Sequence, residues 1–134
     1  MIHLDTSFAI DLFREARRGR FGPAHALLET LDDQPVGVSF FVVCELQDGL
    51  LGSSRSEEER ADITGLLHAL DIAYPDDRFA ERYAQVIHYL RKRSRTVATM
   101  DLMIGVSALV ERAKLVTGNR KHFAMIPDLE IVAY

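Results

Sequence analysis

Three carboxylates occupy positions in this sequence where a side chain could take part in chemistry. Asp5 ends the first apolar run, Glu45 interrupts a nearly continuous apolar run, and Asp101 precedes a third. Carboxylates that cluster repel one another, and a divalent cation relieves that repulsion. Oxygen ligands suit hard ions such as Mg²⁺ or Mn²⁺, which activate water and stabilise phosphodiester transition states. If the three acids converge, they predict a metal-dependent hydrolytic site.

Each of these acids also has an ordinary structural explanation. Asp5 would serve as a helix cap, and Asp101 would complement a helix dipole from the first turn. Glu45 would lie on the one wet stripe of its helix. Asn119 follows a short apolar strand after a glycine, which is common turn chemistry. Only the combination of these residues therefore indicates a site, with Asn119 as a neutral oxygen beside the acids.

The segments around these residues alternate between strand and helix patterns. Strands are predicted at residues 1–4, 36–38, 71–74, 115–117 and 129–133. Helices are predicted over the segment that includes residues 8–13 and over residues 24–32, 40–51, 56–70, 76–93 and 100–112. Thr6-Ser7, Ser39 and Thr99 are the expected N-caps. This alternation predicts a three-layer α/β/α sandwich with a mainly parallel sheet, in which ligands bind beyond the carboxyl ends of the strands.

Composition limits the classes of protein that fit. The chain has 134 residues, and 16 Lys and Arg against 20 Asp and Glu give a formal net charge of −4. This length predicts a single domain over residues 1–134. The lone Cys44 excludes an internal disulfide framework and fits a reducing, cytoplasmic compartment. No apolar run approaches the roughly 18 residues of a membrane span, and the mild acidity argues against nucleic-acid binding through bulk charge.

Taken in order, these segments resemble PIN-domain ribonucleases, and in particular the VapC toxins of VapBC toxin–antitoxin pairs. The matching segments are residues 2–7, 38–45 with Gly49, 99–108, and 115–119 with Phe123. They extend over almost the whole chain. The resemblance implies a five-stranded, mainly parallel sheet flanked by helices (a PIN-like fold) and a Mg²⁺- or Mn²⁺-dependent endoribonuclease.

The resemblance also implies roles for individual residues. The metal-binding catalytic acids would be Asp5, Glu45 and Asp101, supported by Thr6, Ser7, Thr117 and Asn119. In the implied mechanism Asp5 and Asp101 hold the ion, Glu45 binds it directly or through water, and a metal-activated water attacks the phosphorus. The products would carry a 5′-phosphate and a 3′-hydroxyl. The family often has a further acid where this chain has Asn119, so the number of ions, one or two, stays open.

Cationic side chains are expected along the approach to the acids, because RNA is a polyanion. The candidates are Arg120 and Lys121, directly after Asn119, and then Arg14 and Arg17. Solvated helix ends are the alternative explanation for these cations. The resemblance further implies a cognate antitoxin, whose tail covers the acidic pocket, and a homodimer, with no membrane partner.

Two other interpretations remain open at this stage. One is a catalytically weak PIN-like module that acts by binding RNA or a protein, which the missing fourth acid favours. It predicts binding without turnover at saturating Mg²⁺ or Mn²⁺. The other is a phosphoacceptor signalling domain, which is also an α/β protein with an acidic pocket. It fits poorly, because the first strand ends in the lone Asp5 and not in paired acids.

Overall fold

A five-stranded sheet forms the centre of the computed structural model, which describes residues 1–31 and 33–134. The strands lie in the order β3-β2-β1-β4-β5, and every neighbouring pair is parallel. Their bounds are β1 (Ile2–Leu4), β2 (Val36–Ser39), β3 (Asp71–Ala73), β4 (Lys114–Val116) and β5 (Ile131–Val132). The predicted α/β class and the parallel five-stranded sheet are confirmed.

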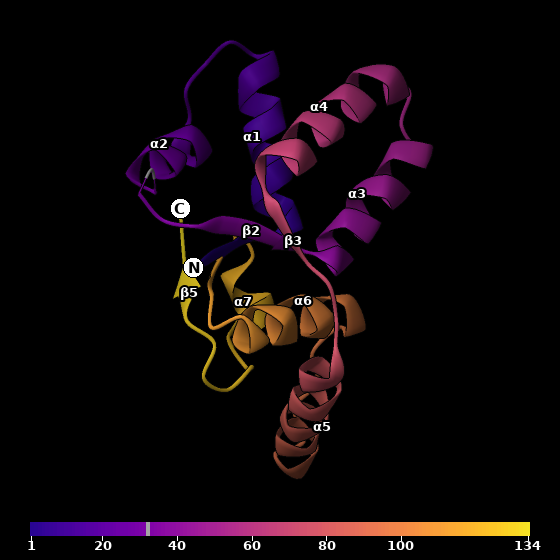
Figure 1. The fold of residues 1–134 in the computed structure, drawn as a ribbon, viewed down its shortest axis with the longest axis vertical. Coiled ribbons are helices and arrows are strands. Elements are labelled where there is room, and N and C mark those ends of the chain that lie inside the picture. The colour runs from indigo at the N-terminus through magenta and orange to yellow at the C-terminus, as the bar shows by residue number, and fades with distance from the viewer. Residues whose placement is uncertain (32) are drawn as a thin grey trace.

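Helices cover both faces of this sheet (Figure 1). One face carries α1 (Thr6–Arg17), α2 (Pro23–Thr30), α3 (Phe40–Leu51) and α4 (Ser56–Ala69). The other face carries α5 (Asp77–Lys92), α6 (Thr99–Val110) and α7 (Arg120–Phe123). The chain moves outward from β1 to β3 and then crosses to β4 on the other side of β1. The carboxyl ends of β1 and β4 therefore form a topological switch point, where open α/β sheets bind ligands.

The core explains why the central strands are so apolar. Ile2 and Leu4 of β1 and Leu115 and Val116 of β4 are all almost completely buried. A parallel strand with helices on both faces has no wet side, so its sequence reads as a continuous hydrophobic run. None of the helices in the described parts of the chain is long and apolar enough to cross a lipid bilayer.

The helix caps differ in part from those predicted. Ser39 is the N-cap of α3, and its hydroxyl accepts a hydrogen bond from the Phe41 N–H at 3.1 Å, as predicted. The caps predicted at Thr6-Ser7 and Thr99 are wrong, because Asp5 and Ala98 occupy the N-cap positions without a side-chain cap bond. The Thr6 and Ser7 hydroxyls bond to acidic side chains instead, which is a first sign that this turn serves a site.

Other differences concern the ends of elements. The predicted strand at 129–133 is only Ile131–Val132, and β4 begins and ends one residue earlier than predicted. Residue 32, the last of the helix predicted at 24–32, lies outside the described residues, and α2 ends at Thr30. The short helix α7 was not predicted. It matters because it carries side chains into the cavity described next.

Candidate active site

The three acids singled out from the sequence line one cavity of about 590 Å³. Asp5 directly follows β1, Glu45 lies on α3, and Asp101 lies in the first turn of α6. Thr6, Ser7 and Asn119 line the same cavity. The cavity thus lies at the carboxyl ends of β1 and β4, at the switch point of the sheet.

A hydrogen-bond network holds the Asp5 carboxylate in place. The hydroxyls of Ser7 and Thr117 both donate to Asp5 Oδ2, at 2.8 and 2.7 Å. The Ser7 hydroxyl accepts from the Gly118 N–H at 3.1 Å, and the Thr117 hydroxyl accepts from the Asn119 N–H at 2.9 Å. Asp5 and Thr117 are 3% and 0% exposed. Because both hydroxyls bond the same oxygen, they fix the rotation of the Asp5 carboxylate. These hydrogen bonds also connect the loop after β4 to the turn after β1.

Glu45 is held from a different element. The Thr6 hydroxyl donates to Glu45 Oε1 at 2.7 Å, which joins the start of α1 to the middle of α3. Burial raises the pKa of Glu45, the Thr6 hydrogen bond opposes this rise, and the negative charges of Asp5 and Asp101 add to it. Burial is therefore the largest cause of the raised pKa, and repulsion from the neighbouring carboxylates makes a smaller contribution.

Asp101 faces a base as well as acids. Burial raises the pKa of Asp101, His122 counteracts this rise, and Asp5 adds to it. His122 Nδ1 lies 3.2 Å from Asp101 Oδ2, and His122 and Asn119 both line the cavity. The loop after β4 and the start of α7 therefore face the first turn of α6 across the cavity.

The donor chemistry of the cavity fits a hard divalent cation. Its acids, hydroxyls and the Asn119 amide offer oxygen, the ligand atom that Mg²⁺ and Mn²⁺ prefer. The mutual repulsion of the carboxylates is the electrostatic condition that such a cation relieves. Within residues 1–31 and 33–134, no group of three or more Asp, Glu, His or Cys side chains is placed so that it could hold a metal ion.

The cations predicted to meet RNA lie in different surroundings. Arg14 lines the acidic cavity. Arg17, one turn further along α1, lines an adjoining cavity and forms ion pairs with Asp62 and Glu59 of α4. Arg120 and Lys121 are exposed on α7, between two residues that line the acidic cavity.

Three residues at the site were missed from the sequence. Asp11 lines the cavity, and its position four residues after Ser7 on one helix face was a usable signal. His122 lies three residues after Asn119 on α7, and its signal was weak because a lone histidine is more often a surface or packing residue than a ligand. Tyr134, whose hydroxyl donates to Asp11 Oδ2 at 2.7 Å, gave no signal, because only the fold brings it to α1.

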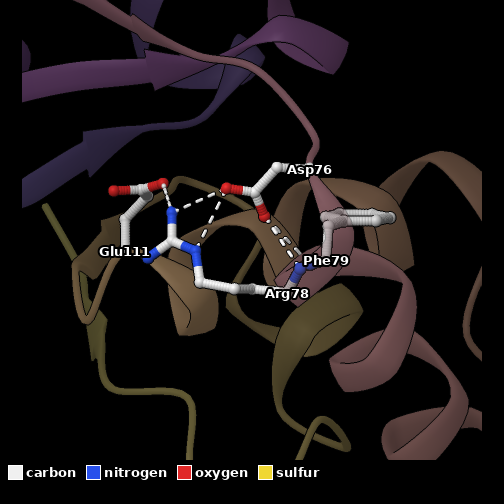
Figure 2. A network of polar contacts seen from close by, with 4 residues as sticks. All are labelled: Asp76, Arg78, Phe79 and Glu111. Carbon is white, nitrogen blue, oxygen red and sulfur yellow. Dashed lines mark hydrogen bonds and ion pairs between the residues drawn. The ribbon is translucent and has the colours of Figure 1, made fainter.

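A second cavity, of about 600 Å³, lies at the opposite, amino ends of the strands. Arg78 lines this cavity, and Figure 2 shows its guanidinium between the carboxylates of Asp76 and Glu111. Asp76 is also the N-cap of α5 and accepts from the backbone N–H groups of Arg78 and Phe79. The Arg78 hydrogen bonds lower the pKa of Asp76 despite some desolvation. Because these charges neutralise one another, this cavity is a weaker candidate for chemistry.

The fold and the acidic cavity together define a class of protein, a parallel α/β protein with clustered acids at the sheet's switch point. Comparison with known families narrows this class, because the PIN domain model matches residues 2–129. The chain therefore belongs to the PIN-domain family. This match gives no support to the phosphoacceptor interpretation.

Individual relatives agree with the family match. Ribonuclease VapC1 of Haemophilus influenzae is 30% identical over 107 residues, which are 80% of each chain. Ribonuclease VapC19 of Mycobacterium tuberculosis is 31% identical over 130 residues, 95% of each. The structure of VapBC2 from Rickettsia felis bound to a DNA fragment from their promoter superposes with a TM-score of 0.89 at 26% identity, covering 100% of this chain and 99% of that one. VapBC-1 from nontypeable H. influenzae gives a TM-score of 0.77 at 28% identity, covering 99% and 98%.

These findings confirm the predicted family, its likeness to VapC ribonuclease toxins, and the assignment to ribonucleases, which are hydrolases. The roles of individual residues, the cation and the partners of this chain remain predictions.

Proposed function

We propose that this chain, acting as a single domain, is a Mg²⁺- or Mn²⁺-dependent endoribonuclease and the toxin of a toxin–antitoxin pair. One observation carries the proposal: Asp5, Glu45 and Asp101 come from three separate elements and line one cavity at the switch point of the sheet. The VapC ribonucleases to which the chain is similar supply the substrate class, RNA.

Asp5 and Asp101 are the residues that would hold the cation, with Glu45 binding it directly or through water and Asn119 as a neutral neighbour. When bound, Mg²⁺ or Mn²⁺ supplies an activated water as nucleophile and screens the charge that builds up on the phosphate oxygens. One or two ions would satisfy this arrangement.

The protein's own contribution is to fix the acids before substrate arrives. The Ser7 and Thr117 hydroxyls orient Asp5, and the Thr6 hydroxyl orients Glu45. Hydrogen bonds of this kind lock the rotamers of reacting groups, so that little reorganisation is needed during the reaction. The three hydroxyl residues act as positioning residues for the acids.

RNA would approach the cavity along its cationic border. Arg120 and Lys121 project from α7 beside Asn119 and His122, and Arg14 lies on the α1 side of the cavity. Arg17 is a weaker contact, because its guanidinium is already paired with acids of α4. Phosphate contacts of this type position a strand without reading its sequence.

Partners follow from the similar structures. VapBC complexes are among the solved structures to which this chain is similar. Another similar structure is described as a toxin–antitoxin complex from Klebsiella pneumoniae. We infer a cognate antitoxin for this chain as well, a homodimeric state and a cytoplasmic location. Size-exclusion chromatography with light scattering tests the homodimer, which predicts about twice the 15.1 kDa chain mass.

Cleavage of a labelled RNA by the purified chain, with and without a chelator, tests the proposed activity. We expect cleavage to require Mg²⁺ or Mn²⁺ and to fall at least about 100-fold in Asp5→Ala and Asp101→Ala, because each removes a cation ligand. Arg60→Ala, on the exposed face of α4, is the matched control and should cleave like the parent. Equal cleavage by the parent and both acid variants, with contaminating nuclease excluded, would overturn the mechanism.

A catalytically weak binding module is the second candidate, favoured by Asn119 in place of a fourth acid. The same RNA distinguishes the two functions. Binding that persists at saturating Mn²⁺ without any product over long incubation would support the module and contradict the nuclease. An Asn119→Asp variant that gains cleavage would show that the missing acid is the reason.

A further inference from the structure

Arg14 occupies an unusual position for a cation. It lies on α1 and lines both the acidic cavity and the adjoining cavity formed by α1, α3 and α4. Its side chain is 65% exposed, so it stands at the opening and not inside. An unrestrained arginine side chain beside several carboxylates would be attracted to them, because opposite charges attract. Something must hold it at the opening.

Asp11 is the group that meets Arg14. The Arg14 guanidinium lies 3.6 Å from Asp11 Oδ1, one turn back on the same helix. The other oxygen of this carboxylate, Oδ2, accepts the Tyr134 hydroxyl at 2.7 Å. The two oxygens of Asp11 therefore have separate partners, and the Tyr134 bond restricts the rotation of the carboxylate that Arg14 meets.

Tyr134 is itself firmly placed. Its ring packs edge-on against the fully buried Phe8, with centroids 4.8 Å apart. Its hydroxyl lies beside Gly118, where an added Cβ would come within 3.1 Å of it. Burial raises the pKa of the Tyr134 phenol well above its usual range, and the hydrogen bond to Asp11 adds to this. The hydroxyl therefore stays protonated at neutral pH and remains a donor to Asp11.

These contacts form a relay from β5 to the opening of the cavity, which we call the Tyr134–Asp11–Arg14 relay. We propose that Asp11 and Tyr134 are positioning residues, which hold the Arg14 guanidinium at the cavity opening to bind a backbone phosphate of the RNA substrate. The proposal rests on the proposed ribonuclease function. Guanidinium is suited to the task, because its planar fork binds phosphate oxygens in pairs and keeps its charge at any relevant pH.

RNA binding as a function of salt tests the relay. A labelled single-stranded RNA is titrated by fluorescence anisotropy in an Asp101→Asn background, which prevents cleavage. Arg14→Gln should weaken binding roughly 5- to 10-fold near 0.1 M salt and reduce the slope of log K against log salt by about 0.7. Arg60→Gln removes the same charge from an exposed site outside both cavities and should leave the slope unchanged.

The Asp11→Asn substitution tests the relay through the direction in which the RNA affinity changes. If Asp11 acted only through its charge, neutralising it would tighten the binding of a polyanion. The relay predicts the opposite, about 3-fold weaker binding with a reduced salt slope, because Arg14 loses its anchor. Tighter binding by Asp11→Asn would overturn the proposal.

Tyr134→Phe tests the far end of the relay without changing any charge. We expect KM for RNA cleavage to rise about 3-fold with kcat unchanged, and no further effect on RNA binding when Arg14→Gln is already present. Tyr74→Phe is the control, because Tyr74 follows β3 at the other edge of the sheet and its side chain is exposed. An effect of Tyr134→Phe that persists in the Arg14→Gln background, or a loss explained by a lower melting temperature alone, would show a structural role only.

The same measurements distinguish a failure of the relay from a failure of the proposed ribonuclease function. If the parent protein neither binds nor cleaves RNA, the proposed function fails and the relay with it. If the parent binds and cleaves RNA while Arg14→Gln keeps its affinity and salt slope, only the relay is wrong.

Discussion

The two ends of the sheet carry cavities of nearly equal size, about 590 and 600 Å³, but their charges are arranged in opposite ways. At the amino end, among the described residues, three of the four cationic side chains that line the cavity pair with acids: Arg78 with Asp76 and Glu111, Arg82 with Asp128, and Lys114 with Glu130. At the carboxyl end, Asp5 and Glu45 accept hydrogen bonds from hydroxyls, Asp101 lies beside His122, and Glu45 meets the negative charges of the other two acids.

The pKa shifts report the same contrast. The Arg78 hydrogen bonds lower the pKa of Asp76, whereas burial and neighbouring acids raise the pKa of Glu45 and Asp101. Paired charges at the amino end stabilise the fold, and the crowded acids at the carboxyl end oppose it. Perturbed acids of this kind concentrate at functional sites, where stability is given up for chemistry.

Glu45→Gln should produce the largest effect, a loss of cleavage together with a gain in stability. The amide keeps an oxygen that accepts the Thr6 hydroxyl but removes the negative charge. We expect cleavage to fall about 100-fold or more, while the free energy of unfolding rises by roughly 0.5–1 kcal/mol, a value kept small because the carboxylate is partly hydrated. Cleavage assays and denaturant titration measure the two effects. A variant that is both active and less stable would contradict the contrast.

The middle of β1, between the two cavities, offers a second test. His3 is 2% exposed, and within the described part of the chain its Nδ1 has no hydrogen-bond partner. Burial and the nearby positive charge of the chain's amino group lower its pKa from 6.5 to about 4. The unfolded chain therefore takes up a proton below pH 6.5 that the folded protein resists until about pH 4.

Because of His3, the free energy of unfolding should fall as the pH drops from 6.5 to about 4, by up to about 3 kcal/mol in total. Denaturant titrations at pH 7, 5.5 and 4.5 measure the slope. His3→Leu should flatten the decline, whereas His68→Gln, at an exposed position on α4, should leave it unchanged. An equal decline in His3→Leu and the parent would assign the pH dependence to other groups.

Asp76→Asn should give the smallest effect, opposite in sign to that of Glu45→Gln. The variant weakens the bonds to Arg78 that lower the pKa of Asp76, so the melting temperature should fall slightly while cleavage is unchanged. The difference from the parent should shrink in high salt and at acidic pH, because the stabilisation from a depressed carboxylate pKa is lost as the pH falls. Loss of cleavage at an unchanged melting temperature would place chemistry at the amino end.

Much of the site was predictable from residue order alone. Asp5 and Asn119 were expected together because parallel strands bring their carboxyl ends to one edge, and the resemblance to PIN-domain ribonucleases implied that Glu45 and Asp101 join them. The structure agrees, since all four line one cavity. Thr117 was also singled out, and its hydroxyl does bond Asp5.

Contacts that depend on long-range placement were not predictable. Tyr134 reaches Asp11 over 123 positions in sequence, and no local pattern marks Tyr134 as Asp11's partner. The caps predicted at Thr6-Ser7 and Thr99 failed because cap propensity is local, whereas the Thr6 and Ser7 hydroxyls are used by Glu45 and Asp5. Departure from local rules is expected where side chains are committed to a site.

An anomalous-scattering map of crystals grown with Mn²⁺ tests the central claim most directly, because it locates the ion and its ligands together. The account predicts a peak in the carboxyl-end cavity, within about 2.0–2.3 Å of oxygens from Asp5 and Asp101. No peak there at saturating Mn²⁺, or a peak bound instead by Asp76 and Glu111 at the amino end, would contradict it.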